Sequence, residues 1–397
     1  MKINKIHFLF FLIIMAFCLA IYFAIFFPII NMYPAYYDLA IDIQNNNYTN
    51  LFIPFGYAAI ISIINDVEIS VRVFQFLSLI FVWLITLYVC VDVNSVNKIK
   101  NLKIYNLNFI WIFFWFTFLF FNPYFHLNTI RIIDTSLTTF FIAALYALII
   151  IKFKFSKILL IIGGILLGLL IAIRPNSIIL ILFFLIFFNK NFILKQQTLI
   201  MFTSTFLTYA FFSKFITGEF LFWPNNGPYN LFAGNNLYAF EYLKIEHNAE
   251  NSLQKANEWC GIKIENPHLV SGVEYFNCTL NYIQNDFLGF VKTTIFKFYN
   301  LLFRPNFKLA FETYKVIFQI LLVIPAYIWW LSFFLNSSFR KEFSVKWAAL
   351  FIIIYSSVFI GTNTDPRMAL PIDFIYIMSA ISFLTKGQSN KIAQNLN

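Results

Sequence analysis

The sequence ILLIIGGILLGLLIAI at residues 158–173 decides the class of fold. It contains no charged side chain, and only the tetrapeptide RPNS at 174–177 separates it from a further apolar run that ends near residue 189. A helix of about 20 apolar residues crosses the roughly 30 Å of hydrocarbon in a lipid bilayer. Both runs approach that length, so they predict two helices that cross a membrane in succession.

Apolar runs of this kind recur along the whole chain. They occupy residues 6–30, 72–92, 104–121, 135–151, 158–173, 177–189, 197–213, 316–335, 346–361 and 368–385. The shorter run Leu51–Ile64 contains Pro54 and Gly56, which favours a helix lying at the membrane interface over a further crossing. The sequence therefore predicts an all-α polytopic membrane protein with about ten transmembrane helices and one long outer-face loop.

The composition leads to the same class. Of the 397 residues, 60% are hydrophobic and 12% are charged, whereas soluble domains are about 45–50% apolar and about 25% charged. A soluble fold could not remove this much apolar surface from water. The net charge of +10 does not indicate a nucleic-acid partner, because the basic residues are dispersed over short connections instead of gathering on one face.

The basic residues alternate between the connections and so predict an orientation. One set of connections carries most of them: Lys2, Lys5, Lys98, Lys100, Lys103, Lys152, Lys154, Lys157, Lys190, Lys195, Arg340, Lys341, Lys346, Lys386 and Lys391. The short connections of the other set carry only Arg72, Arg131, Arg174 and Arg367. Because positive residues are retained in the cytoplasm, both termini are expected there. The predicted location is a bacterial plasma membrane, with nearly all acidic residues on the outer side.

This orientation divides the chain into three parts. Residues 1–213 form a module of about seven helices, with a first outer loop at 31–71. Residues 214–315 form one long extracytoplasmic loop, and residues 316–397 contain about three further helices. The long loop is rich in turns but not of low complexity, so we expect it to fold against the outer mouth of the helices.

The four cysteines do not have the spacing of a metal site. Cys18 and Cys90 lie in apolar runs, where we expect them to pack as inert residues. Cys260 and Cys278 both lie in the long loop. In an oxidising compartment they can form a disulfide, and the sequence leaves this alternative and two free thiols equally open.

The first outer loop contains a pair of acidic residues that could carry chemistry. Asp38 and Asp42 are four residues apart, so on a helix they share one face. Two carboxylates on one face can hold a divalent cation or act as acid and base. The spacing alone favours a solvated helix face, so we assign no metal ligand and leave a divalent cation as an open cofactor.

Charged residues also stand at the mouths of later helices. Asp134 opens a helix, where it can cap the N-terminus, and Arg131 can pair with it. Arg174 has almost no loop around it, so it either snorkels to the headgroups or meets a carboxylate or a phosphate. Asp365 and Arg367 lie in the last outer turn. Together these turns predict an outward-facing site for a phosphate-bearing molecule.

Several short motifs occur in a fixed order along the chain. They are Tyr36-x-x-x-Ala40, Pro54-x-Gly56-Tyr57, Val71-Arg72-x-x-Gln75, Gly164-x-x-x-Gly168 with Arg174-Pro175, Asn230-Leu231-x-x-Gly234-Asn235-Asn236 and Asp365-x-Arg367-x-x-x-Pro371. In this order the chain resembles the GT-C membrane glycosyltransferases, in the branch that includes protein O-mannosyltransferases and bacterial lipid A aminoarabinose transferases. The resemblance covers residues 31–371.

The resemblance implies transfer of a sugar from a polyprenyl-phosphate donor to a glycan, lipid or protein acceptor on the outer face of the membrane. In such enzymes a first-loop acid is the general base and basic residues hold the lipid phosphate. The usual acid position is Met32 here, so Asp38 is our first choice of base, followed by Asp42 and Asp134. The residues expected to hold substrate or phosphate are Arg131, Arg174, Asn235, Asp365 and Arg367.

Two alternative functions fit parts of the pattern. A polymerase of O-antigen or capsule polysaccharide would also have ten or more helices, a large outer loop and outer-loop arginines. A transporter or flippase of a lipid-linked or small anionic substrate would place charges near helix midpoints. Asp373 is the main candidate of that kind, and it can equally pair with a neighbouring helix. The concentration of polar residues in outer loops favours an enzyme over a transporter.

Overall fold

The protein is an assembly of helices in the computed structural model. The structure describes residues 5–29, 34–46, 54–90, 114–115, 117–122, 126, 129–150, 156–188, 194–221, 227–239, 249–262, 272–303, 317, 320–321, 324–334, 343–361 and 370–380. Within these residues every regular element is a helix, which confirms the predicted all-α class.

The bounds of the helices follow the apolar runs of the sequence closely. The helices are α1 (Lys5–Phe26), α2 (Pro34–Gln44), α3 (Phe55–Ile61), α4 (Val67–Cys90), α8 (Thr135–Ile150), α9 (Lys157–Ile173), the 3₁₀ helix η2 (Pro175–Ile179), α10 (Leu180–Phe188), α11 (Leu194–Thr217), α12 (Gly227–Gly234), α14 (Ala249–Trp259), α15 (Gly272–Asn285), α16 (Phe287–Phe303), α18 (Ile324–Phe334), α20 (Phe343–Gly361) and a last helix at Leu370–Ala380. The predicted run at 104–121 is described only from residue 114, where it is helical.

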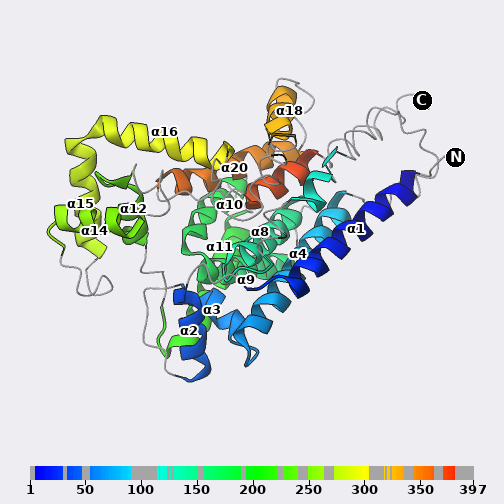
Figure 1. Cartoon of the computed structure of the whole chain (residues 1–397), viewed down its shortest axis with the longest axis horizontal. Coiled ribbons are helices and arrows are strands. Elements are labelled where there is room, and N and C mark those ends of the chain that lie inside the picture. Colours follow the sequence, from blue (N-terminus) through cyan, green and yellow to red (C-terminus); the bar gives the residue numbers. More distant parts are fainter. Residues whose placement is uncertain are drawn as a thin grey trace.

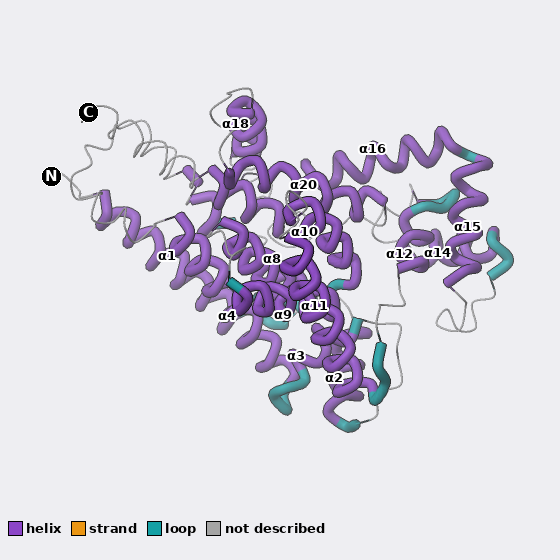
Figure 2. Tube along the Cα trace, turned by 180° about the vertical axis from the view of Figure 1, so that it is seen from behind, coloured by secondary structure: helices purple, strands orange, loops and turns teal. Residues whose placement is uncertain are grey.

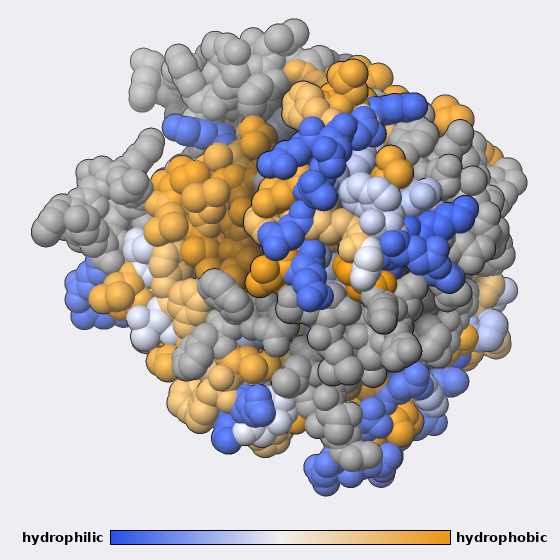
Figure 3. Space-filling view, turned by 90° about the vertical axis from the view of Figure 1, so that its left-hand side faces the viewer, coloured by the Kyte–Doolittle hydropathy of each residue, from blue (hydrophilic) through white to orange (hydrophobic). Residues whose placement is uncertain are grey.

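Two of these helices are long and apolar enough to cross a membrane. The segments are Val67–Thr86 in α4 and Gln196–Thr217 in α11. Six more apolar segments are helical but shorter: Phe11–Phe26, Thr135–Leu148, Lys157–Ile173, Pro175–Phe187, Lys346–Val358 and Leu370–Ala380. On the face of the molecule that carries α14 and α15, hydrophilic side chains gather beside a broad apolar area (Figure 3).

The centre of the bundle is a close pair formed by α9 and α11 (Figure 1). Gly164 and Gly168 of α9 face α11. A Cβ atom on Gly164 would lie 2.5 Å from the Met201 carbonyl oxygen, and one on Gly168 would lie 2.6 Å from the Thr205 carbonyl oxygen. Glycines four residues apart let two helix backbones approach this closely. The motif that contributed to the resemblance therefore has a packing role in this fold.

Helices α12, α14 and α15 form a separate group, which the long helix α16 joins to the bundle (Figures 1 and 2). Phe232 and Tyr275 are the aromatic centre of its small core. Cys260 and Cys278 form a disulfide, which decides between the two alternatives that the sequence left open. This group occupies the part of the chain predicted as the long outer loop.

Candidate functional site

The first three connections that the sequence predicts on the outer side come together at one end of the bundle, where α2 and α3 lie (Figure 1). Gly56 of α3 packs directly on the backbone of Ala172 at the end of α9. Arg72 of α4 donates a hydrogen bond to the carbonyl of Ala24 near the end of α1. Phe23 of α1 in turn packs on Ile130, in the connection before α8. Segments far apart in the sequence thus share one end.

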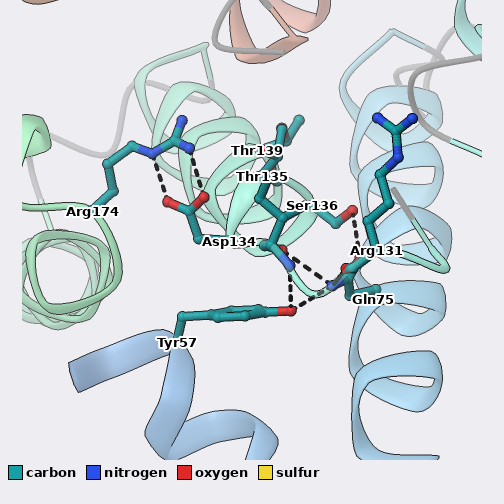
Figure 4. Close-up of polar contacts among 9 residues, drawn as sticks. Tyr57, Gln75, Arg131, Asp134, Thr135, Ser136, Thr139 and Arg174 are labelled. Carbon is teal, nitrogen blue, oxygen red and sulfur yellow. Dashed lines mark hydrogen bonds and ion pairs between the residues drawn. The ribbon is translucent and has the colours of Figure 1, made fainter. Parts of the chain in front are cut away.

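A buried ion pair lies at this end, between the start of α8 and the end of α9. The guanidinium of Arg174 donates from Nε to Oδ2 of Asp134 and from Nη2 to Oδ1, both at 2.7 Å (Figure 4). Each residue is only 5% exposed. The fork of an arginine fits a carboxylate in this bidentate way, so the pair fixes the two helix ends against each other.

The ion pair corrects two expectations about Asp134. Its carboxylate accepts both hydrogen bonds from Arg174, so it neither caps α8 with its side chain nor pairs with Arg131. Arg131 is buried, and its guanidinium points away from Asp134 (Figure 4). The sequence left Arg174 to meet the lipid headgroups, a phosphate or a carboxylate, and in the structure it meets the carboxylate of Asp134. Because its charge is already offset, Arg174 is a weaker candidate for a lipid phosphate than the sequence indicated.

A second polar network holds the backbone in front of Asp134. The Gln75 side chain donates from Nε2 to the Tyr57 hydroxyl at 2.6 Å and to the carbonyls of Arg131 and Ile133 at 2.5 and 3.1 Å. The Ile133 N–H donates to the same Tyr57 hydroxyl at 2.9 Å (Figure 4). Burial raises the pKa of Tyr57, so its hydroxyl stays neutral. The network therefore sets the path of residues 131–133.

The pair Asp38 and Asp42 lies on α2, as the helical spacing predicted. Asp38 is exposed and Asp42 is half-buried, and the structure gives neither carboxylate a hydrogen-bonding partner among the described residues. Helix α2 packs against α3, and the ring of Tyr36 meets that of Tyr57 edge-on at 5.1 Å. The acids thus stand beside the Tyr57 network without touching the ion pair. Among the described residues, no three acidic, histidine or cysteine side chains form a metal-binding group.

Asn235 lies in a different part of the molecule, directly after α12. Its Nδ2 donates to the Leu231 carbonyl at 2.7 Å, and its Oδ1 accepts from Nζ of Lys297 at 2.8 Å. No contact in the described structure connects it with Asp134 and Arg174. The remaining predicted residues, Asp365 and Arg367, lie outside the described residues.

Two further buried polar residues, His126 and Asp373, are held by their neighbours. His126 is buried with Nε2 at 2.7 Å from the Phe120 carbonyl oxygen, and burial lowers its pKa to about 4, so it is neutral at physiological pH. Asp373 is buried and accepts from Asn122 Nδ2 at 3.3 Å and from the Tyr327 hydroxyl at 3.4 Å. Asp373 therefore pairs with its neighbours, which does not favour a transporter.

Sequence reasoning missed Lys297 altogether. The signal that could have found it is the spacing of the buried residues of α16: Thr293, Lys297 and Leu301 follow one another at four-residue intervals. The sequence places Gln75 and Tyr57 in short motifs but predicts no role for either side chain. Their shared role depends on contacts between segments 18 residues apart, which no local pattern reports.

Comparisons of this chain with known proteins gave no family for it. No model of a protein family matches the sequence, and neither a curated protein nor a solved structure gave a significant match.

Proposed function

We propose that this chain is a multi-pass membrane glycosyltransferase of the GT-C kind. It transfers a sugar from a polyprenyl-phosphate donor to a glycan, lipid or protein acceptor outside the cytoplasm. The observation that carries the proposal is the convergence of the first three predicted outer connections at one end of the bundle. There a buried ion pair of Asp134 and Arg174 joins the start of α8 to the end of α9, and the Tyr57–Gln75 network lies beside the short helix α2 that presents Asp38.

The membrane topology is part of this proposal. Two helices have the length of a crossing, and large apolar side chains also point outward from shorter helices, among them Ile158 and Ile353 at 70% and 66% exposure. Lipid solvates such side chains, whereas water does not. We therefore propose about ten crossings, with both termini in the cytoplasm.

Reporter fusions test this topology directly. A phosphatase that is active only outside the cytoplasm should be active when fused near Asn248 and inactive when fused near Lys154. The reason is that Asn248 lies in the long loop and Lys154 lies in a connection rich in lysine. The opposite pattern of activity would refute the orientation.

The chemistry follows from the kinds of group at this end of the bundle. The Asp38 carboxylate accepts the proton of the acceptor hydroxyl, and the oxygen attacks the anomeric carbon of the sugar. The bond from that carbon to the phosphate oxygen breaks, and a cation stabilises the departing phosphate. Asp134 and Arg174 serve as positioning residues that hold two helix ends. Asp42, four residues after Asp38, completes a pair that can take up a divalent cation.

The variant Asp38→Asn tests the choice of base. Loss of a general base lowers kcat by roughly 10²–10⁴-fold, so we expect sugar transfer to fall by this factor. The fold should be unaffected, because Asp38 is exposed. Glu68→Gln is the matched control, since Glu68 is an exposed acid in the first turn of α4. Transfer measured on purified protein with a polyprenyl-phosphate sugar should show no change in the control. Equal activity of both variants would exclude Asp38 as the base.

A further inference from the structure

Lys297 is a buried cation on the inner side of α16. Its side chain is 0% exposed, and the residues one turn before and after it, Thr293 and Leu301, are buried as well. The opposite side of the helix carries exposed apolar residues, such as Ile295 and Phe298. A lysine on the exposed side of α16 could extend its amine away from the protein, but the amine of Lys297 is enclosed.

The amine of Lys297 is only partly satisfied in the structure. A charged ammonium has three N–H donors, and Nζ has one acceptor among the described residues, Oδ1 of Asn235 at 2.8 Å. No carboxylate of the described residues lies within ion-pair distance of it. Burial without a counter-ion lowers the pKa of Lys297 to about 7. Two donor positions and one charge of Lys297 therefore lack a partner among the described residues.

Asn235 is held so that its oxygen faces the lysine. Its amide nitrogen donates to the Leu231 carbonyl one turn earlier in α12, at 2.7 Å, and this bond fixes which end of the amide is turned toward Nζ. Asn236 is likewise tied to the backbone, from Nδ2 to the Phe232 carbonyl at 2.9 Å. The end of α12 is thus a rigid frame, and the amine of α16 is the group beside it that remains to be neutralised.

We propose that Lys297 and Asn235 form a subsite for a phosphate group, apart from the Asp38 end of the bundle; resting on the proposed function, we assign it to a polyprenyl phosphate. A phosphate brings negative charge and several acceptor oxygens, which satisfy the remaining donors of an ammonium. The buried guanidinium of Arg174 is already neutralised by Asp134. Both groups of the subsite are closed to solvent in this structure, so the phosphate enters as α12 moves away from α16.

Binding measurements on the purified full chain in nanodiscs test the subsite. The probes are inorganic phosphate and a short-chain polyprenyl phosphate, with the matching polyprenol as a control for the hydrocarbon. We expect Lys297→Met to weaken binding of both phosphates at least tenfold. Lys292→Met should leave both affinities unchanged, because Lys292 is an exposed lysine of the same helix.

Asn235→Asp is a second variant that retains the buried lysine. It places a carboxylate beside the amine, which should satisfy the charge internally and exclude phosphate. Because the variant loses the hydrogen bond from Nδ2 to the Leu231 carbonyl, its thermal unfolding is measured beside the binding. If both Lys297→Met and Asn235→Asp bind phosphate with wild-type affinity, the subsite is overturned.

The two proposals can fail separately. Binding of inorganic phosphate that depends on Lys297, without binding of polyprenyl phosphate, would support the subsite and remove its link to a lipid donor. Sugar transfer that requires polyprenyl phosphate, together with wild-type binding of both phosphates by both variants, would support the proposed function and overturn the subsite.

Discussion

Arg174→Met is expected to lower the free energy of unfolding by about 3–5 kcal/mol, because it leaves a buried carboxylate without its partner. Asp134 is 5% exposed, and its carboxylate accepts hydrogen bonds from Arg174 alone among the described residues. The expected result is a protein that unfolds at much lower temperature or denaturant concentration in detergent micelles. Lys157→Met is the control, because Lys157 is exposed at the opposite end of α9.

A double variant separates the ion pair from the general loss of packing. Asp134→Leu combined with Arg174→Met removes both charges, and replacing a buried pair by apolar residues of similar volume is often nearly neutral. We expect the double variant to regain most of the stability lost in Arg174→Met. A single variant as stable as the Lys157→Met control would show that the pair does not hold the two helix ends.

Gly56→Ala is expected to cost about 1–3 kcal/mol, since an added methyl group has no room. A Cβ atom on Gly56 would lie 2.5 Å from the carbonyl carbon of Ala172 and 2.6 Å from the nitrogen of Ile173. These are backbone atoms, which cannot rotate away as a flexible side chain could. Helix α3 must therefore shift on α9, and Tyr57, the next residue, would shift with it away from Gln75.

The matched control for this change is Gly227→Ala. A Cβ atom on Gly227, at the start of α12, would meet no atom within 4 Å. We expect Gly227→Ala to unfold at the wild-type midpoint and Gly56→Ala to unfold well below it. Equal midpoints would mean that α3 does not need its close approach to α9.

The sequence predicted the helices well because hydropathy is a local property. The run predicted at 135–151 is observed as α8 at Thr135–Ile150, and the run at 197–213 lies inside α11. The need of Arg174 for a partner was also predictable, because burial of an arginine between two apolar runs demands one. Its choice of Asp134 was not, since the two residues are 40 positions apart and Arg131 is the nearer cation in sequence.

For the candidate site, the sequence predicted which charged residues stand at helix ends, but not which of them meet. Which of them meet depends on how the helix ends pack, and that is set by residues without charge, such as Gly56 and Gln75. Lys297 escaped notice because a lysine in a polar, aromatic stretch resembles an ordinary surface residue. Only its place on the buried side of α16 distinguishes it from the exposed Lys292.

In the topology proposed above, the bond between Cys260 and Cys278 links the maturation of the protein to the export of its middle segment. Disulfides form and persist in oxidising compartments. The segment that carries α14 and α15 can therefore reach its final form only after it has arrived in one, whereas the packing of α9 on α11 needs no oxidant. In the proposed topology, the step that needs an oxidant is therefore confined to the group around Tyr275.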